Sequence, residues 1–176
     1  MAQATFHFPR GFLWGTATAS HQVEGNNTNN NWWAWEQQPG HIWQEHKSGL
    51  ACDWWGGRWR EDFDRAAETG QNAHRLSVEW SRVQPTPDRW DEEALDRYMN
   101  MVRGLLERDI MPFVTLHHFS DPLWLVEQGG WENEAVVGKF EAFVRRVVET
   151  LKDYVSYWFT INEPNVYTTE MYLLGH

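Results

Sequence analysis

A single carboxylate stands out in the segment Phe159–Asn165, which reads FTINEPN, because an apolar run leads directly to it. Proline disfavours helical geometry in the residue before it, so we expect Glu163 to stay extended where the run ends. Pro164 can itself be the first residue of a helix. A carboxyl group held half removed from water favours its protonated form and can donate a proton near neutral pH. The pattern indicates a general acid, and the alternative is an acid that only interacts favourably with a helix dipole.

Three further apolar runs also end in hydrogen-bonding side chains. All four runs are short and rich in β-branched and aromatic residues, which predicts buried strands. Because polar groups occur at every strand end, they indicate a common site. The further runs are Phe12–Thr18, followed by Ser20, His21, Gln22 and Glu24; Ala73–Val78, which contains Arg75 and leads to Glu79; and Met111–His117, followed by His118.

Amphipathic helices are predicted between these strands, over 58–70, 91–109 and 133–154. In the helix predicted over 91–109, Asp91 is the expected N-cap. Its apolar stripe comprises Leu95, Tyr98, Val102, Leu105 and Leu106. Alternation of apolar strands with helices predicts parallel βα units, whose chemistry collects where the strands finish. We expect one α/β domain over residues 1–176, with a long Trp-rich βα loop at about 19–57.

Two basic features within the predicted strands allow more than one interpretation. A buried guanidinium needs an anionic partner, so Arg75 either serves the site or forms a structural ion pair with Glu79 or Glu36. His117 and His118 are adjacent, and successive strand residues face opposite sides, so both cannot easily bind one metal ion. Acidic residues with a recognisable ligand spacing are also missing. We expect one histidine to point into the site and the other to pack, with no metal.

Composition excludes several classes of function. The chain has 25 acidic and 15 basic residues, a net charge of −10, which argues against a nucleic-acid partner. No apolar run approaches the ~20 residues needed to span a bilayer, and the first ten residues lack a signal-peptide core, so no membrane partner is expected. The single cysteine, Cys52, is expected to be buried, and it suggests a reducing, cytoplasmic location.

Five segments together resemble glycoside hydrolase family 1, the retaining β-glucosidase group. The resemblance is collinear over nearly the whole chain. It implies a (β/α)8 TIM barrel, of which this chain holds about the first four βα units, the N-terminal half. It also implies a β-glycosidase that needs no cofactor. The segments read FPRGFLWGTATASHQVEG, CDWWGGRWREDF, NAHRLSVEWSRVQP, TLHHFSDPLWL and FTINEPN.

The resemblance also implies roles for individual residues. Glu163 matches the general acid/base of the family, and Asn162 matches the amide that binds the sugar 2-hydroxyl. Gln22 and His118 match side chains that bind hydroxyls of the glycone sugar. Arg75 matches the arginine that sits beside the nucleophile. The implied substrate is a β-glycoside or oligosaccharide with a terminal β-linked sugar.

The sequence departs from the family pattern in two ways. Phe119 stands where many members have tryptophan, which leaves the glycone preference open. No TENG-like motif, which carries the nucleophile in the family, occurs in these 176 residues. Retention requires two carboxylates ~5–5.5 Å apart, so the isolated chain is expected to be inactive.

Half a barrel would leave unpaired strand edges and an exposed apolar patch. We therefore expect a complementary C-terminal half-barrel or self-association. One alternative is a non-catalytic half-barrel fragment that serves in assembly or binds sugars. A weaker alternative is another barrel glycosidase whose fourth strand also ends in Asn-Glu-Pro.

Overall fold

The structure is a computed structural model and describes residues 7–175. These residues form one sheet, in which four strands lie in chain order and each neighbouring pair is parallel. The order and the pairing confirm the predicted βα organisation, and two strands have the predicted bounds. The strands are β1 (Gly15–Ala17), β2 (Ala73–Ser77), β3 (Met111–His117) and β4 (Tyr157–Ile161).

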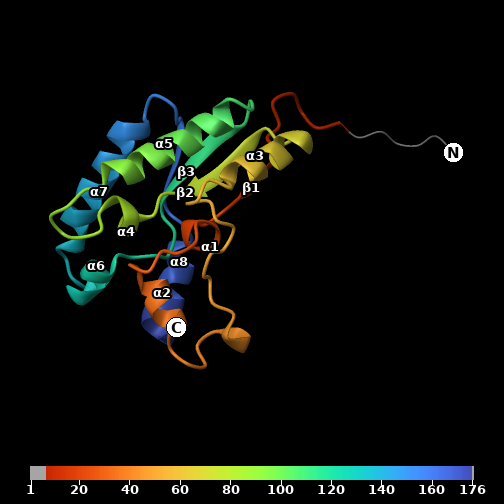
Figure 1. Ribbon diagram of the computed structural model, residues 1–176. Coiled ribbons are helices and arrows are strands. Elements are labelled where there is room, and N and C mark those ends of the chain that lie inside the picture. The colour runs from red at the N-terminus through yellow and green to blue at the C-terminus, as the bar shows by residue number, and fades with distance from the viewer. Residues whose placement is uncertain (1–6, 176) are drawn as a thin grey trace.

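Three long helices connect the strands and pack along the sheet (Figure 1). They are α3 (Trp59–Glu68), α5 (Glu92–Leu106) and α7 (Val136–Leu151). Helix α5 lies between the other two and contacts both. The main core forms where their apolar faces meet β2 and β3. It includes Phe63, Leu95, Tyr98, Val114, Leu116, Phe143 and Val147.

Helix α5 shows how the local sequence sets an element. The Asp91 side chain accepts a hydrogen bond from the Ala94 backbone N at 3.0 Å, which confirms the predicted N-cap. Four of the five predicted stripe residues are buried, but Leu106 is 40% exposed. Leu106 directly follows Leu105, so it lies about 100° further around the helix and points away from the core.

Short helices gather beyond the carboxyl ends of the strands. The long connection after β1 contains the first three of them, within the predicted Trp-rich loop. The last two form a continuous segment after β4. They are α1 (Ser20–Val23), α2 (Asn31–Glu36), η1 (Trp43–Glu45), α4 (Trp80–Val83), α6 (Leu123–Glu127), η2 (Gly130–Glu132), α8 (Pro164–Thr168) and the π-helical η3 (Thr169–Leu174).

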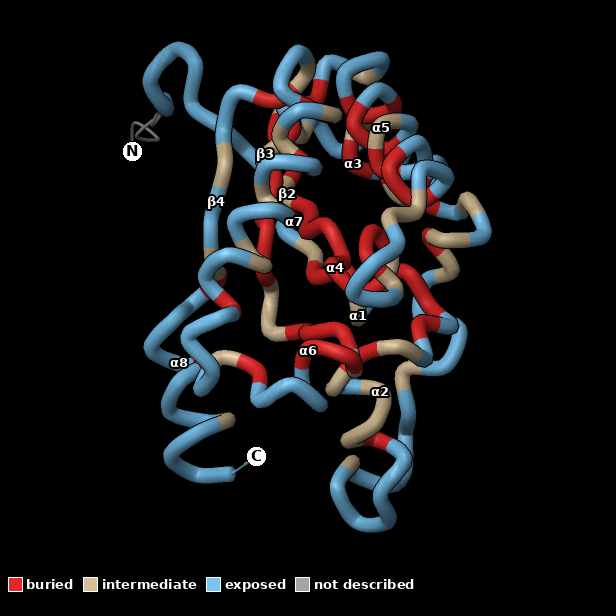
Figure 2. The backbone as a smooth tube through the Cα atoms, turned by 90° about the vertical axis from the view of Figure 1, so that its left-hand side faces the viewer, coloured by how far each residue is buried: buried red, intermediate tan, exposed pale blue. Residues whose placement is uncertain are grey.

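The outer strands are not buried, contrary to the prediction for all four runs. All three residues of β1 are exposed, and in β4 Tyr157 and Phe159 are 49% and 42% exposed. Figure 2 shows β4 as mostly exposed, whereas β2 and β3 are largely buried. These two strands are exposed because β1 and β4 are the edges of the sheet. The run predicted at Phe12–Thr18 is a strand only where it pairs with β2, at Gly15–Ala17.

Two predictions from composition can be compared with the structure. Cys52 is exposed, so the prediction that it is buried is wrong. It lies in an irregular turn after Gly49, outside any helix or strand, where nothing packs over it. Within residues 7–175, no helix is both long enough and apolar enough to cross a bilayer.

Candidate active site

Two predicted site residues meet above β3. Arg75 extends from β2, and its Nη2 donates a hydrogen bond to Oδ1 of Asn162, just beyond β4, at 3.0 Å. The guanidinium carbon also lies 5.3 Å from the centre of the Phe159 ring. The Asn162 backbone N donates to the His117 carbonyl at 2.9 Å, which fixes the end of β4 against β3. Strand pairing therefore brings together residues 87 positions apart in the chain.

Arg75 has no carboxylate partner among residues 7–175, so the structural ion pair with Glu79 or Glu36 is not formed. Both carboxylates have other partners: Glu36 accepts hydrogen bonds from the backbone N and the hydroxyl of Ser48, and Glu79 accepts from three serines. Within the described chain, the Arg75 Nε is buried without a hydrogen-bond partner. The Nε–H of Arg75 can therefore donate a hydrogen bond to a group outside the described residues.

Gln22 and His118 line one cavity of about 570 Å³, together with Trp32 and Phe119. Burial lowers the pKa of His118 to about 4, and the neighbouring Arg75 and His117 side chains add to this effect. The ring is therefore neutral at pH 7, with one nitrogen that donates and one that accepts. Its Nδ1 is buried and lacks a partner among residues 7–175. A neutral imidazole beside an exposed amide side chain suits the binding of hydroxyl groups.

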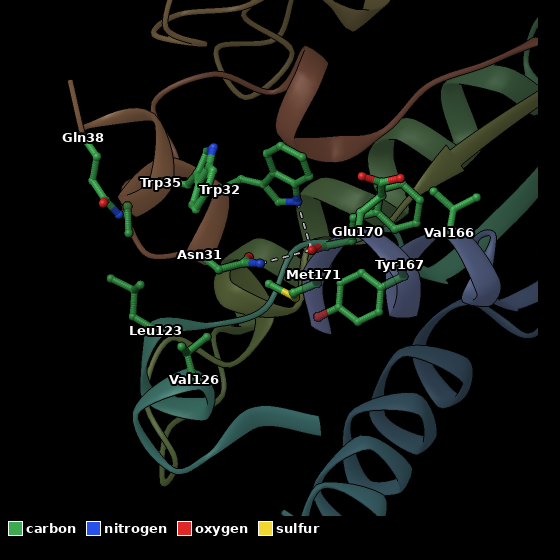
Figure 3. Close-up of a pocket in the computed structure, with 12 residues that line it drawn as sticks. Asn31, Trp32, Trp35, Gln38, Leu123, Val126, Val166, Tyr167, Glu170 and Met171 are labelled. Carbon is green, nitrogen blue, oxygen red and sulfur yellow. Dashed lines mark hydrogen bonds between the residues drawn. The ribbon is translucent and has the colours of Figure 1, made fainter. Parts of the chain in front are cut away.

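A second, mainly apolar cavity of about 320 Å³ adjoins the first, because Trp32 and Phe119 line both. Figure 3 shows its walls, which come from α2, α6 and the segment after β4. The Phe119 carbonyl accepts hydrogen bonds from Trp32 Nε1 at 3.0 Å and from Asn31 Nδ2 at 3.3 Å. These bonds hold α2 against the loop after β3, so the shared wall is fixed at two points.

Glu163 lies at the junction of β4 and α8 but not in the expected conformation. Its φ and ψ are 42° and 60°, in the left-handed region, so the prediction of an extended backbone is wrong. Pro164 excludes the right-handed helical region for Glu163, and the abrupt turn from strand to helix then selects the left-handed one. Glu163 is exposed within residues 7–175, so the expectation of a half-buried carboxylate is also wrong for this part of the chain. Pro164 is the first residue of α8, as predicted.

The two adjacent histidines separate as predicted. His118 faces the cavity, whereas His117 is 1% exposed and its Nε2 lies 3.0 Å from Oδ1 of Asp121. The His117 ring packs edge-on against Trp131 and Tyr167. Among residues 7–175, no group of three or more metal-ligating side chains is arranged to hold an ion.

The carboxylate of Glu79, which the sequence placed after the second strand but with no serine partners, connects three strand-end loops. Glu79 is fully buried and accepts hydrogen bonds from the hydroxyls of Ser20, Ser81 and Ser120, at 2.7, 2.8 and 2.6 Å. Ser20 lies two residues before Gln22, and Ser120 lies two residues after His118. Serines are common in loops, so their presence alone gave no signal of a shared acceptor.

A second network behind the site joins Glu24 to α4 and α5. Glu24 accepts hydrogen bonds from Arg82 Nε at 2.6 Å and from the Tyr98 hydroxyl at 2.7 Å. Tyr98 in turn accepts a hydrogen bond from the Glu79 backbone N at 2.9 Å. The polar residues after β1 and β2 are thus anchored to the helix layer.

Comparisons with known proteins agree on one family. The sequence model described as Glycosyl hydrolase family 1 matches residues 4–176. Beta-glucosidase A of Thermotoga maritima is 36% identical over 174 residues, which cover 96% of this chain and 39% of that protein. The 1,4-beta-D-glucan glucohydrolase of Thermotoga neapolitana is 35% identical, with 96% and 41% covered. The chain thus spans about 40% of the length of the curated relatives that it matches.

Solved structures agree with this result. A beta-glycosidase from Pyrococcus horikoshii gives a TM-score of 0.86 at 42% identity, covering 94% of this chain and 38% of that one. The family 1 b-glucosidase from Thermotoga maritima gives a TM-score of 0.91 at 36% identity, covering 96% and 39%.

Proposed function

Because the chain belongs to glycosyl hydrolase family 1, we propose that it carries the acid/base side of a retaining β-glycosidase, which hydrolyses terminal β-linked sugars from glycosides. Its fold is of the (β/α)8 TIM-barrel type, and residues 7–175 form about the first four βα units. In such barrels the active site lies at the carboxyl ends of the strands. Of the proposed site residues, Gln22, His118, Asn162 and Glu163 follow strands at this edge, and Arg75 reaches Asn162 from the middle of β2.

The observation that carries the proposal is the hydrogen bond between Arg75 and Asn162, since it joins two proposed site residues across the sheet. In the proposed mechanism, Glu163 protonates the leaving oxygen and later deprotonates the attacking water. Asn162 binds the sugar 2-hydroxyl. The neutral His118 and Gln22 bind glycone hydroxyls in the cavity that they share.

The nucleophile would be a carboxylate from outside these 176 residues, held beside Arg75. The unpartnered Nε of Arg75 supports this role, because a buried guanidinium is stabilised by an anion. A second copy of the chain, the alternative partner, would bring no nucleophile of this kind, so the added part would be a complementary C-terminal half-barrel. It would pair with the edges β1 and β4 and cover the exposed Tyr157 and Phe159.

On this proposal the isolated chain hydrolyses nothing at a useful rate. The exposed position of Glu163 is consistent with a site that another segment completes. The cytoplasmic location expected from the sequence stays a prediction.

The role of Glu163 can be tested in a completed barrel. We define this as the present chain co-expressed with the part of Thermotoga maritima beta-glucosidase A that it does not cover. Aryl β-glucosides suit the assay because the second cavity is mainly apolar. Glu163→Gln should abolish turnover of substrates with poor leaving groups, and azide should restore turnover of activated ones. Retaining enzymes form a glycosyl intermediate that azide can attack without a general base.

Glu127→Gln is the matched control, since Glu127 is also exposed but lies at the end of α6. It should behave like the unmodified chain with both classes of substrate. If azide gives no rescue in Glu163→Gln, or if both variants lose activity equally, Glu163 is not the acid/base.

A further inference from the structure

The Asp121 carboxylate is a buried acceptor that connects three separate elements. Asp121 is 1% exposed and follows β3 by four residues. Its oxygens accept hydrogen bonds from His117 Nε2 at 3.0 Å and from Trp131 Nε1 at 3.1 Å, and from the Tyr167 hydroxyl. These donors come from β3, η2 and α8. A buried carboxylate with several charge-assisted hydrogen bonds fixes its donors strongly.

Among these donors, Tyr167 connects Asp121 to the proposed acid/base. Its backbone N donates to the Glu163 carbonyl at 3.0 Å, which forms the first turn of α8. Its ring is 8% exposed and stacks on Phe119 at 5.7 Å between centroids. Burial, together with the Asp121 carboxylate, raises the pKa of Tyr167, so the hydroxyl remains a donor. Tyr167 is therefore held through its backbone N by Glu163 and through its hydroxyl by Asp121.

Glu163 needs such support because of its backbone. A left-handed conformation is unfavourable for a residue other than glycine and persists only where the surroundings enforce it. On the strand side, Asn162 is held by the His117 carbonyl at 2.9 Å. On the helix side, Tyr167 is the side chain that anchors α8 to the buried network. The Glu163 conformation is thus fixed from both directions.

We propose that Asp121 is a positioning residue, which acts through Tyr167 to hold the start of α8 and so aims the Glu163 carboxyl group. This inference rests on the proposed function of Glu163. Proton transfer needs the donor within hydrogen-bond reach of the leaving oxygen, so small displacements of the donor slow it. Substrates that leave as stable anions need little protonation. If the Glu163 carboxyl group is no longer held in position, hydrolysis of substrates with poor leaving groups should slow more than hydrolysis of substrates with good leaving groups.

The test compares Tyr167→Phe with Trp131→Phe in the completed barrel. Each variant removes one donor to the same carboxylate, but only Tyr167 has a backbone link to Glu163. For Tyr167→Phe, kcat/KM for an alkyl β-glucoside should fall by about tenfold, whereas that for 2,4-dinitrophenyl β-glucoside should change by less than about twofold. In Trp131→Phe the ratio of the two values should stay as in the unmodified chain.

The quantity kcat/KM is chosen because it reports the first chemical step, in which the acid acts. If Tyr167→Phe lowers both values equally, or changes neither, the inference is wrong. If the unmodified assembly hydrolyses neither substrate, the proposed function fails, and a second readout tests the inference by itself.

That readout is amide hydrogen exchange in the 176-residue chain. Tyr167→Phe should speed exchange at residues 163–168 relative to Trp131→Phe, because α8 loses its anchor. Equal exchange in the two variants would show that the Tyr167 hydroxyl does not hold this segment. Asp121→Asn should resemble Tyr167→Phe in both measurements.

Discussion

Residues at the strand ends gain their properties from neighbours that are distant in sequence. Asn162 is oriented by Arg75 and by the His117 carbonyl, which lie on two other strands. His118 is neutral at pH 7 because burial, with the nearby Arg75 charge, opposes its protonation. Glu163 has a constrained backbone and an exposed side chain, so its environment as the proposed acid depends on what comes to cover it.

His74 gives a prediction for the pH dependence of stability. It is 4% exposed, and its ring contacts the Thr16 hydroxyl at 2.9 Å and packs near Phe63. Burial lowers its pKa to about 4, from 6.5. Between these values the folded state binds fewer protons than the unfolded state, so stability rises with pH and is fully present above about 6.5. Up to about 3 kcal/mol should be lost as the pH falls to 4.

Urea unfolding between pH 4 and 7 measures this effect. His74→Gln should show a smaller pH dependence than the unmodified chain. The comparison isolates His74, because His118 titrates in the same range in both proteins. Identical pH profiles would mean that His74 does not contribute in this way.

Sequence reasoning identified several of these residues but not their conformations. The proline rule excluded a right-handed helical Glu163 correctly, but it could not choose between the extended and left-handed regions. The geometry of the turn makes that choice. The Asp121 and Glu79 networks were missed because each joins side chains from separate loops. No spacing along the chain reveals such contacts.

Among the elements, the strands and long helices followed from local pattern. The bounds of β3 and β4 were predicted at both ends, because each strand is a short apolar run that stops at polar residues. Strand β1 was predicted too long, since its length is set by pairing with β2. The loops after the strands hold their positions through Glu79, which accepts hydrogen bonds from loops after β1, β2 and β3.

Removal of this acceptor should destabilise the chain strongly. Glu79→Ala leaves three buried hydroxyls without their partner and opens a space among them, so unfolding should be easier by about 3 kcal/mol or more. Glu61→Ala is the control, because Glu61 is exposed and its contacts with Arg58 and Arg65 are surface pairs. That change should have a much smaller effect, because exposed ion pairs contribute little to stability.

Chemical denaturation of both variants at pH 7 provides the comparison. A similar small loss in Glu79→Ala and Glu61→Ala would show that Glu79 does not connect the loops energetically.

For the molecule as a whole, the important feature is an apolar sheet with two open edges. Helices cover one side of it, while β4 is mostly exposed (Figure 2), and its Tyr157 and Phe159 are 49% and 42% exposed. The pattern of a strand shows that it is apolar but not what covers it, so burial of β1 and β4 was predicted wrongly. The chain corresponds to about 40% of the length of its curated relatives, and they contain further polypeptide.

The central claim is that the site becomes active only when a second carboxylate is supplied. The direct measurement is hydrolysis of 4-nitrophenyl β-glucoside by the 176-residue chain alone and by the completed barrel, with assembly checked by size-exclusion chromatography. We predict no turnover above background for the chain alone and clear turnover for the assembly. With an alkyl β-glucoside, whose leaving group is poor, Glu163→Gln should abolish the turnover of the assembly. Turnover by the chain alone, or an intact assembly with no activity, would contradict the claim.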